Sequence, residues 1–150
     1  MNNKHTALRG LLWFICLYHV TLGLCANLPA PQVQAVGSAL LGLHLPDNPA
    51  LFQLLKPFGV YVAVFGVMMG VAAWNPVKNR ALISVGVVLF ALRLLQRLTD
   101  LEGVQQNLGV TSGRNWATIA TVAAFTVLLA TLRWKLYRDM HATGTPTTQA

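Results

Sequence analysis

The stretch "WATIATVAAFTVLLATLRW", Trp116 to Trp134, is apolar up to Arg133 and is bracketed by two tryptophans. As an α-helix it covers about 27 Å, close to the roughly 30 Å hydrocarbon core of a bilayer. Tryptophan favours the membrane interface because its ring is apolar while its indole N–H stays hydrated. The stretch therefore predicts a helix that spans a membrane.

Three other apolar stretches are long enough to span: Leu8 to Leu28, Pro57 to Trp74 and Arg80 to Thr99. Of the 150 residues, 55% are hydrophobic and 10% are charged, whereas a soluble domain has about 25% charged residues. A compact unit of this length cannot bury so much apolar surface in its own core. The sequence predicts an all-α membrane protein, a four-transmembrane-helix bundle in a single domain, 1–138, with a disordered tail, 139–150.

The first apolar stretch also has features of a secretory signal. Lys4 precedes it and Arg9 lies at its start, as a signal peptide requires, but Leu24 is too bulky for a cleavage site beside Cys25. We therefore expect a retained first helix.

Basic residues gather at one side of the predicted bundle. Seven of the eleven lysines and arginines mark that side: Lys4, Arg9, Lys78, Arg80, Arg133, Lys135 and Arg138. The positive-inside tendency predicts that both termini and the turn "WNPVKNR", Trp74 to Arg80, are cytoplasmic, in the inner membrane of a bacterium. Topology and anionic lipid headgroups account for the net charge of +7. We expect a lipid bilayer and no nucleic acid as partner, because no basic face has interleaved aromatic residues.

The connection between the first two spans, residues 29–56, carries four of the prolines. Its segment Val33 to Leu43 is too short to span, and it predicts a short amphipathic piece that lies along the outer interface as a lid.

A stripe of small residues marks the second span. Gly59, Ala63, Gly66 and Gly70 recur at spacings of four, three and four, so they share one helix face and permit close approach of another backbone. The stripe does not reveal whether its partner is a helix of the same chain or of another protein.

Charged residues interrupt the third span. Arg93, Gln96, Arg97 and Asp100 fall on one helix face. In one interpretation this face anchors the helix at the outer interface, with Asp100 pairing Arg97 and Arg93 reaching the interface along its stem. In the other, Arg93 faces inward, because intramembrane charges usually face the bundle.

The inward interpretation combines this face with two histidines. His19 lies at nearly the depth of Arg93, and His44 approaches from the lid. Such an outward-opening pocket, made of His19, Arg93, Gln96, Arg97, Asp100 and His44, suits a quinone headgroup or a small anion.

Other cofactors and chemistries find little support in the sequence. A haem held by two imidazoles does not fit one chain because only His19 lies well inside the membrane. A lone membrane histidine is more often hydrogen-bonded within a bundle than bound to a chlorophyll-type pigment. Cys16 and Cys25 fall on opposite helix faces and predict neither a disulfide nor a metal site. No catalytic motif is present, so we expect no catalytic residue and no bound metal.

The order of these features resembles the small four-helix DoxX and BphX-like membrane proteins. The resemblance covers roughly Leu8 to Arg138, and "WNPVKNR" is its most specific piece. DoxX-type proteins are associated with quinone-linked sulfur oxidation, so the resemblance implies a quinone-interacting redox component. Small size and the small-residue stripe instead favour a non-catalytic accessory subunit that stabilises a larger redox or energy-transducing complex. Its partners are then other membrane subunits or copies of itself. A transporter is a poorer third choice, because four helices leave little room for a gated path.

Overall fold

The computed structural model of the chain describes residues 5–142. Its elements are α1 (Thr6–Cys25), α2 (Ala30–Val36), the π-helical η2 (Gly37–Leu41), α3 (Pro49–Trp74), α4 (Arg80–Thr99), α5 (Leu101–Leu108) and α6 (Ser112–Ala142). The helices α1, α3, α4 and α6 are each long and apolar enough to cross a membrane. The prediction of an all-α, four-span membrane protein is confirmed, as is that of a short helical segment between the first two spans.

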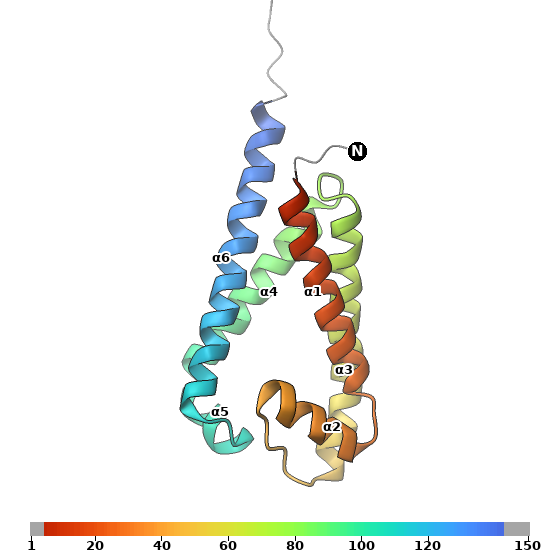
Figure 1. The fold of residues 1–150 in the computed structure, drawn as a ribbon, viewed down its shortest axis with the longest axis vertical. Coiled ribbons are helices and arrows are strands. Elements are labelled where there is room, and N and C mark those ends of the chain that lie inside the picture. Colours follow the sequence, from red (N-terminus) through yellow and green to blue (C-terminus); the bar gives the residue numbers. More distant parts are fainter. Residues whose placement is uncertain (1–4, 143–150) are drawn as a thin grey trace, which may run out of the picture.

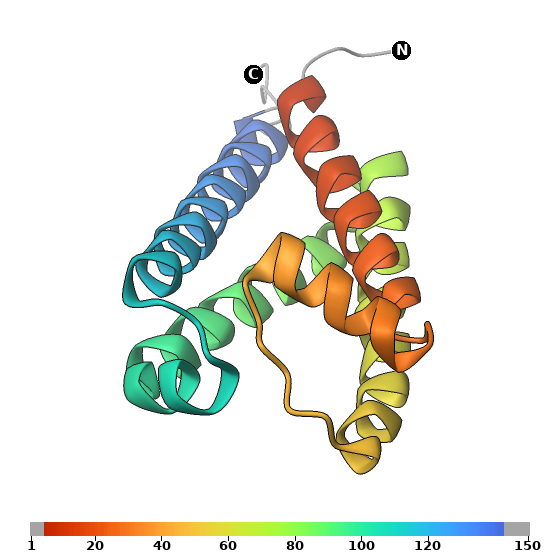
Figure 2. The same ribbon diagram turned by 60° about the horizontal axis from the view of Figure 1, so that its bottom comes forward.

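The four long helices form two antiparallel pairs, α1 with α3 and α4 with α6 (Figure 1). The pairs meet at the end where α1 begins, α3 turns into α4 and α6 ends, which we call the basic end. They diverge toward the opposite end (Figure 1). There α2 and η2 lie across the space between the pairs, and we call this the lid end (Figure 2).

The apolar core explains this shape. One cluster of buried side chains joins all four spans: Leu8, Leu12, Ile15, Cys16, Phe65, Met69, Ala72, Ala73, Ile83, Phe90, Val122, Leu129 and Leu136. A separate cluster at the lid end holds Val33, Leu45 and Phe52 together. Because the two clusters are distinct, the lid has its own small core.

The small-residue stripe of α3 lies against α1. A Cβ atom added at Gly66 would lie 2.8 Å from the Val20 nitrogen and 2.9 Å from the Cys16 oxygen. Gly23 of α1 packs just as closely against α3, since a Cβ atom there would lie 2.6 Å from the Ala63 nitrogen. Glycine is needed at these positions because backbone occupies the place of a side chain. The partner of the stripe is therefore a helix of the same chain.

Polar side chains at the basic end donate hydrogen bonds to the backbone carbonyl groups at the end of α3. The Arg9 Nε donates to the Ala73 carbonyl at 3.0 Å, and the Asn79 Nδ2 donates to the Val71 carbonyl at 3.0 Å. The last carbonyls of a helix have no partner within it, so both bonds complete the end of α3. Between α4 and α6, the Arg133 Nε donates to the Ser84 hydroxyl at 3.1 Å.

Several helix bounds differ from the predicted ones. The second span begins at Pro49 and not at Pro57, because Asn48 caps it by accepting a hydrogen bond from the Ala50 N–H at 2.9 Å. Proline at the first helical position needs no donor and has a suitable φ. Helix α6 begins at Ser112 and runs to Ala142, past the predicted domain boundary at 138. Residues 143–150 of the predicted tail lie outside the described residues.

Candidate functional site: a polar row inside the membrane

His19 is buried in the middle of the bundle, with 4% of its surface exposed. Its Nδ1 lies 2.9 Å from the Ile15 carbonyl oxygen. In the neutral ring, Nδ1 therefore carries the proton and Nε2 is a hydrogen-bond acceptor. Within the described residues Nε2 has no hydrogen-bond partner. His19 thus presents a free acceptor inside the membrane-spanning region.

Aromatic rings surround this histidine and connect all four spans. Phe65 of α3 and Phe90 of α4 meet the His19 ring edge-on, with ring centroids 5.0 and 5.8 Å away. Phe90 also contacts Phe125 of α6 at 6.4 Å, and Phe125 stacks on Phe14 of α1 at 5.6 Å. These rings fix the position of His19 and keep its surroundings apolar.

A row of side chains on α4 leads from His19 toward the lid end. Arg93 and Arg97 follow Phe90 by three and seven residues, so the three share one helix face. Seven residues of helix cover about 10 Å. Arg93 is half-buried and lies within electrostatic reach of both His19 and Arg97. The face that contacts His19 therefore continues as a positively charged face.

The row ends at Asn115, a fully buried residue in the first turn of α6. Its Oδ1 accepts a hydrogen bond from the Arg97 Nη1 at 3.0 Å. Its Nδ2 has no partner among the described residues. A buried donor without a partner costs about 1–3 kcal/mol, so such atoms call for an explanation. One explanation is a ligand that accepts this hydrogen bond.

The predicted pocket residues fall into two groups. His19, Arg93 and Arg97 belong to the polar row, whereas Gln96 and Asp100 are exposed. The expected pairing of Arg97 with Asp100 is wrong, because Arg97 donates to Asn115 and the Asp100 carboxylate packs over Gly103.

His44 does not join the row either. Its side chain is exposed and lies against Gly109, while its backbone N–H donates to the Leu108 carbonyl at 2.8 Å. Its role in the structure is to fasten the lid to the end of α5.

Sequence reasoning missed Asn115 and the aromatic cluster. Asn115 stands directly before Trp116, and a polar amide beside a membrane span is a signal for a buried hydrogen bond. The phenylalanines gave no signal because they resemble ordinary lipid-facing or core residues.

A shallow groove of about 340 Å³ opens at the side of the bundle near this cluster. Phe14 and Tyr18 of α1 line it together with Leu40 of η2. Tyr18 also contacts the His19 ring, with centroids 5.3 Å apart. The groove is therefore an apolar surface that adjoins the aromatic cluster.

The chemistry available along the row is hydrogen bonding and positive charge. Arg93 and the Asn115 Nδ2 are donors, and the His19 Nε2 is an acceptor. Within residues 5–142, no group of three or more His, Cys, Asp or Glu side chains is placed to hold a metal ion. The arrangement is suited to a flat, lipid-soluble molecule with a polar head.

No protein-family model, curated protein or solved structure matches this chain. The turn that carries most of the resemblance to DoxX and BphX-like proteins has a local role here, because Asn75 and Asn79 bond to backbone groups beside them. What stands from the resemblance is the small four-span membrane architecture.

Proposed function

We propose that this chain is a quinone-binding subunit of a membrane assembly. The observation that carries the proposal is the row of polar groups between His19 and Asn115, with a buried unpartnered atom at each end. A quinone has carbonyl oxygens that accept hydrogen bonds, and a quinol has hydroxyls that donate them. The row offers both complements along one helix face with apolar surroundings.

Each part of such a ligand has a matching environment. Arg93 and the Asn115 Nδ2 donate to carbonyl oxygens, and the His19 Nε2 accepts from a hydroxyl of the reduced form. Phe65 and Phe90 provide aromatic surface for the ring. The isoprenoid tail leaves through the groove beside Phe14 and Tyr18 into lipid.

Binding of a short-chain quinone to the purified protein in lipid nanodiscs tests the proposal. Replacement of Arg93 by leucine removes a charged hydrogen-bond donor, worth about 1.5–3 kcal/mol, and weakens binding roughly tenfold or more. His19→Phe keeps an aromatic ring but removes the Nε2 hydrogen-bond acceptor, so it weakens binding of the quinol more than that of the quinone. Arg138→Leu, an exposed arginine at the basic end, is the control and binds normally. Equal binding by all three variants would exclude the site.

The proposed role is that of a subunit because quinone chemistry needs electrons from elsewhere.

A second candidate, an accessory subunit without its own ligand, is favoured by α4, which buries only Ile83, Gly86 and Phe90. Val88, Leu92 and Leu95 on the same helix are each more than half exposed, which leaves an apolar surface for a partner helix. The mass of the native protein in mild detergent distinguishes the two. A large assembly that forms without bound quinone favours the accessory role. In both cases we place the protein in the inner membrane of a bacterium, with its basic end cytoplasmic.

A further inference from the structure

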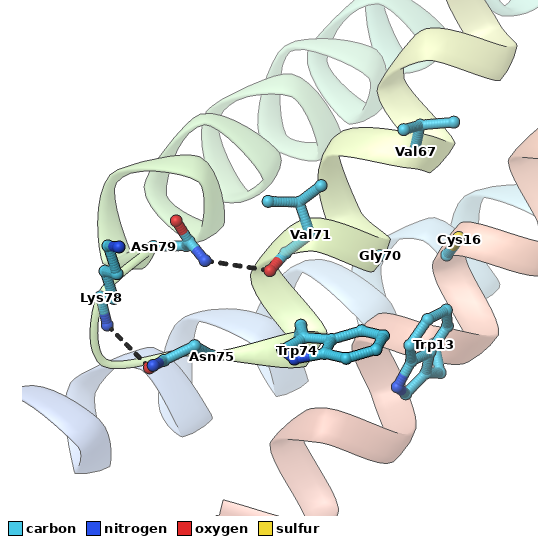
Figure 3. Close-up of a pocket in the computed structure, with 9 residues that line it drawn as sticks. All are labelled: Trp13, Cys16, Val67, Gly70, Val71, Trp74, Asn75, Lys78 and Asn79. Atoms are coloured by element: carbon cyan, nitrogen blue, oxygen red, sulfur yellow. Dashed lines mark hydrogen bonds between the residues drawn. The ribbon is translucent and has the colours of Figure 1, made fainter.

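A second hollow lies at the basic end and shares no residue with the polar row. It is an open groove of about 600 Å³ between α1 and α3, beside the loop that joins α3 to α4. Figure 3 shows the rings of Trp13 and Trp74 side by side, with the loop residues Asn75 and Lys78 beyond Trp74. Its volume is within the range of small-molecule sites.

The floor of the groove is apolar and is set by a glycine. Gly70 of α3 packs so closely on α1 that an added Cβ atom would lie 2.8 Å from the Cys16 sulfur. On either side Val67 and Val71 are about half exposed, at 55% and 49%. From Val67 to Trp74 the groove follows about 10 Å of helix, so it reaches from the interface into the hydrocarbon region.

The mouth of the groove carries hydrogen-bond donors and a positive charge. The Lys78 ammonium has no ion-pair partner among the described residues, and no acidic residue lines the groove. The Asn75 Oδ1 accepts from the Lys78 backbone N–H at 3.1 Å, which leaves the Asn75 amide nitrogen available to a ligand. Trp13 and Trp74 are 40% and 76% exposed and add indole N–H groups at the interface. Such a mouth is complementary to an anionic group.

We infer that this groove binds one anionic phospholipid. Its phosphate lies at Lys78 and Asn75, and one acyl chain follows Val71 and Gly70 past the two tryptophans. A second copy of the chain is a poorer occupant, because with the same orientation in the membrane it would bring two basic ends together. The inference is independent of the proposed quinone site, since the two share no residue.

Quenching of tryptophan fluorescence by brominated lipids tests this inference. The full chain carrying Trp116→Phe and Trp134→Phe retains only the two tryptophans of the groove. It is reconstituted in phosphatidylcholine with increasing fractions of brominated phosphatidylglycerol or of brominated phosphatidylcholine. We expect the anionic lipid to quench at lower mole fractions, by about fivefold, as one basic residue at an anionic surface predicts.

Two variants locate the effect. Lys78→Gln removes the preference for phosphatidylglycerol. Lys135→Gln keeps this preference, because it removes an exposed basic residue of α6 at the same end of the molecule but outside the groove. Val71→Phe fills the groove and lowers quenching by both lipids. Equal quenching by the two lipids, or a preference that survives Lys78→Gln, would overturn the inference. A dimer whose formation excludes both brominated lipids would assign the groove to a second copy instead.

Discussion

Single glycines decide how closely the first two spans approach. At Gly66 the space for a side chain is filled by backbone atoms of α1, so Gly66→Ala forces the helices apart. Overpacking of this kind costs about 1–3 kcal/mol. We expect a correspondingly lower free energy of unfolding in detergent, measured by loss of helical circular dichroism.

Gly10 provides the matched control, because it lies on the same pair of helices but has open space around it, with nothing within 4 Å of an added Cβ atom. Gly10→Ala leaves stability unchanged or raises it slightly. If the two substitutions had the same effect, the loss would come from the glycine backbone and not from the contact with α1.

The polar row could be predicted from the sequence only in part. His19, Arg93 and Arg97 were predictable because a charged or polar side chain within an apolar run is costly unless it faces the bundle. The partner of Arg97 was not predictable, because Asp100 is the better charge match and lies closer in the chain. Asn115 became its partner because α6 begins earlier than its tryptophans suggested, which brings the amide onto the helix beside α4.

The lid, made of α2 and η2, is held in place by an arginine of α6. The Arg114 Nη2 donates to the Ala39 carbonyl at 3.0 Å, and the arginine stem covers Gly42. The guanidinium thus lies at the carboxyl end of η2, where a positive charge is favourable. Gly42 ends this helix with φ of +66°, a conformation that other residues adopt at a cost of about 1–2 kcal/mol.

Loss of the hydrogen bond between Arg114 and Ala39 is expected to loosen the lid without unfolding the spans. In Arg114→Ala, amide hydrogen exchange across residues 37–45 rises by about fivefold, which corresponds to about 1 kcal/mol of lost local stability. Gly42→Ala strains the same turn and raises exchange in the same segment. Arg138→Ala serves as control. Faster exchange in α1 or α3 as well would mean that the lid and the spans open as one unit.

The long elements were predictable and the short ones less so, for a physical reason. A span must satisfy its backbone internally over some 20 apolar residues, which leaves a clear pattern in the sequence. Helix α5 has no comparable pattern, since "LEGVQQNL" mixes polar and apolar residues over two turns. Gly109, whose residue type is typical of a turn, does adopt a left-handed conformation, but it follows this helix.

For the whole molecule, four spans place the two ends of every helix pair on fixed sides of the membrane. Val77 lies in the loop between α3 and α4 at the basic end, and Asp47 lies in the loop between η2 and α3 at the lid end. In a background without Cys16 and Cys25, we expect Asp47→Cys to react with a membrane-impermeant maleimide in intact cells. Val77→Cys reacts only after the membrane is permeabilised. The reverse pattern would show the opposite orientation, and labelling of both would contradict four spans.

Each helix pair is built from a continuous half of the chain, and this has a consequence for biosynthesis. All residues of the contact between α1 and α3 have been translated once Trp74 is added, before α4 is made. At about 5–20 residues per second, α4 to α6 follow roughly 3–13 s later, which is ample time for the first hairpin to enter the bilayer and close. The second hairpin then inserts against a finished surface, with Phe65 and His19 already in place to receive Phe90. The short loop after Trp74 thus separates two assembly steps, and a break there is the one that two separately made halves are best able to survive.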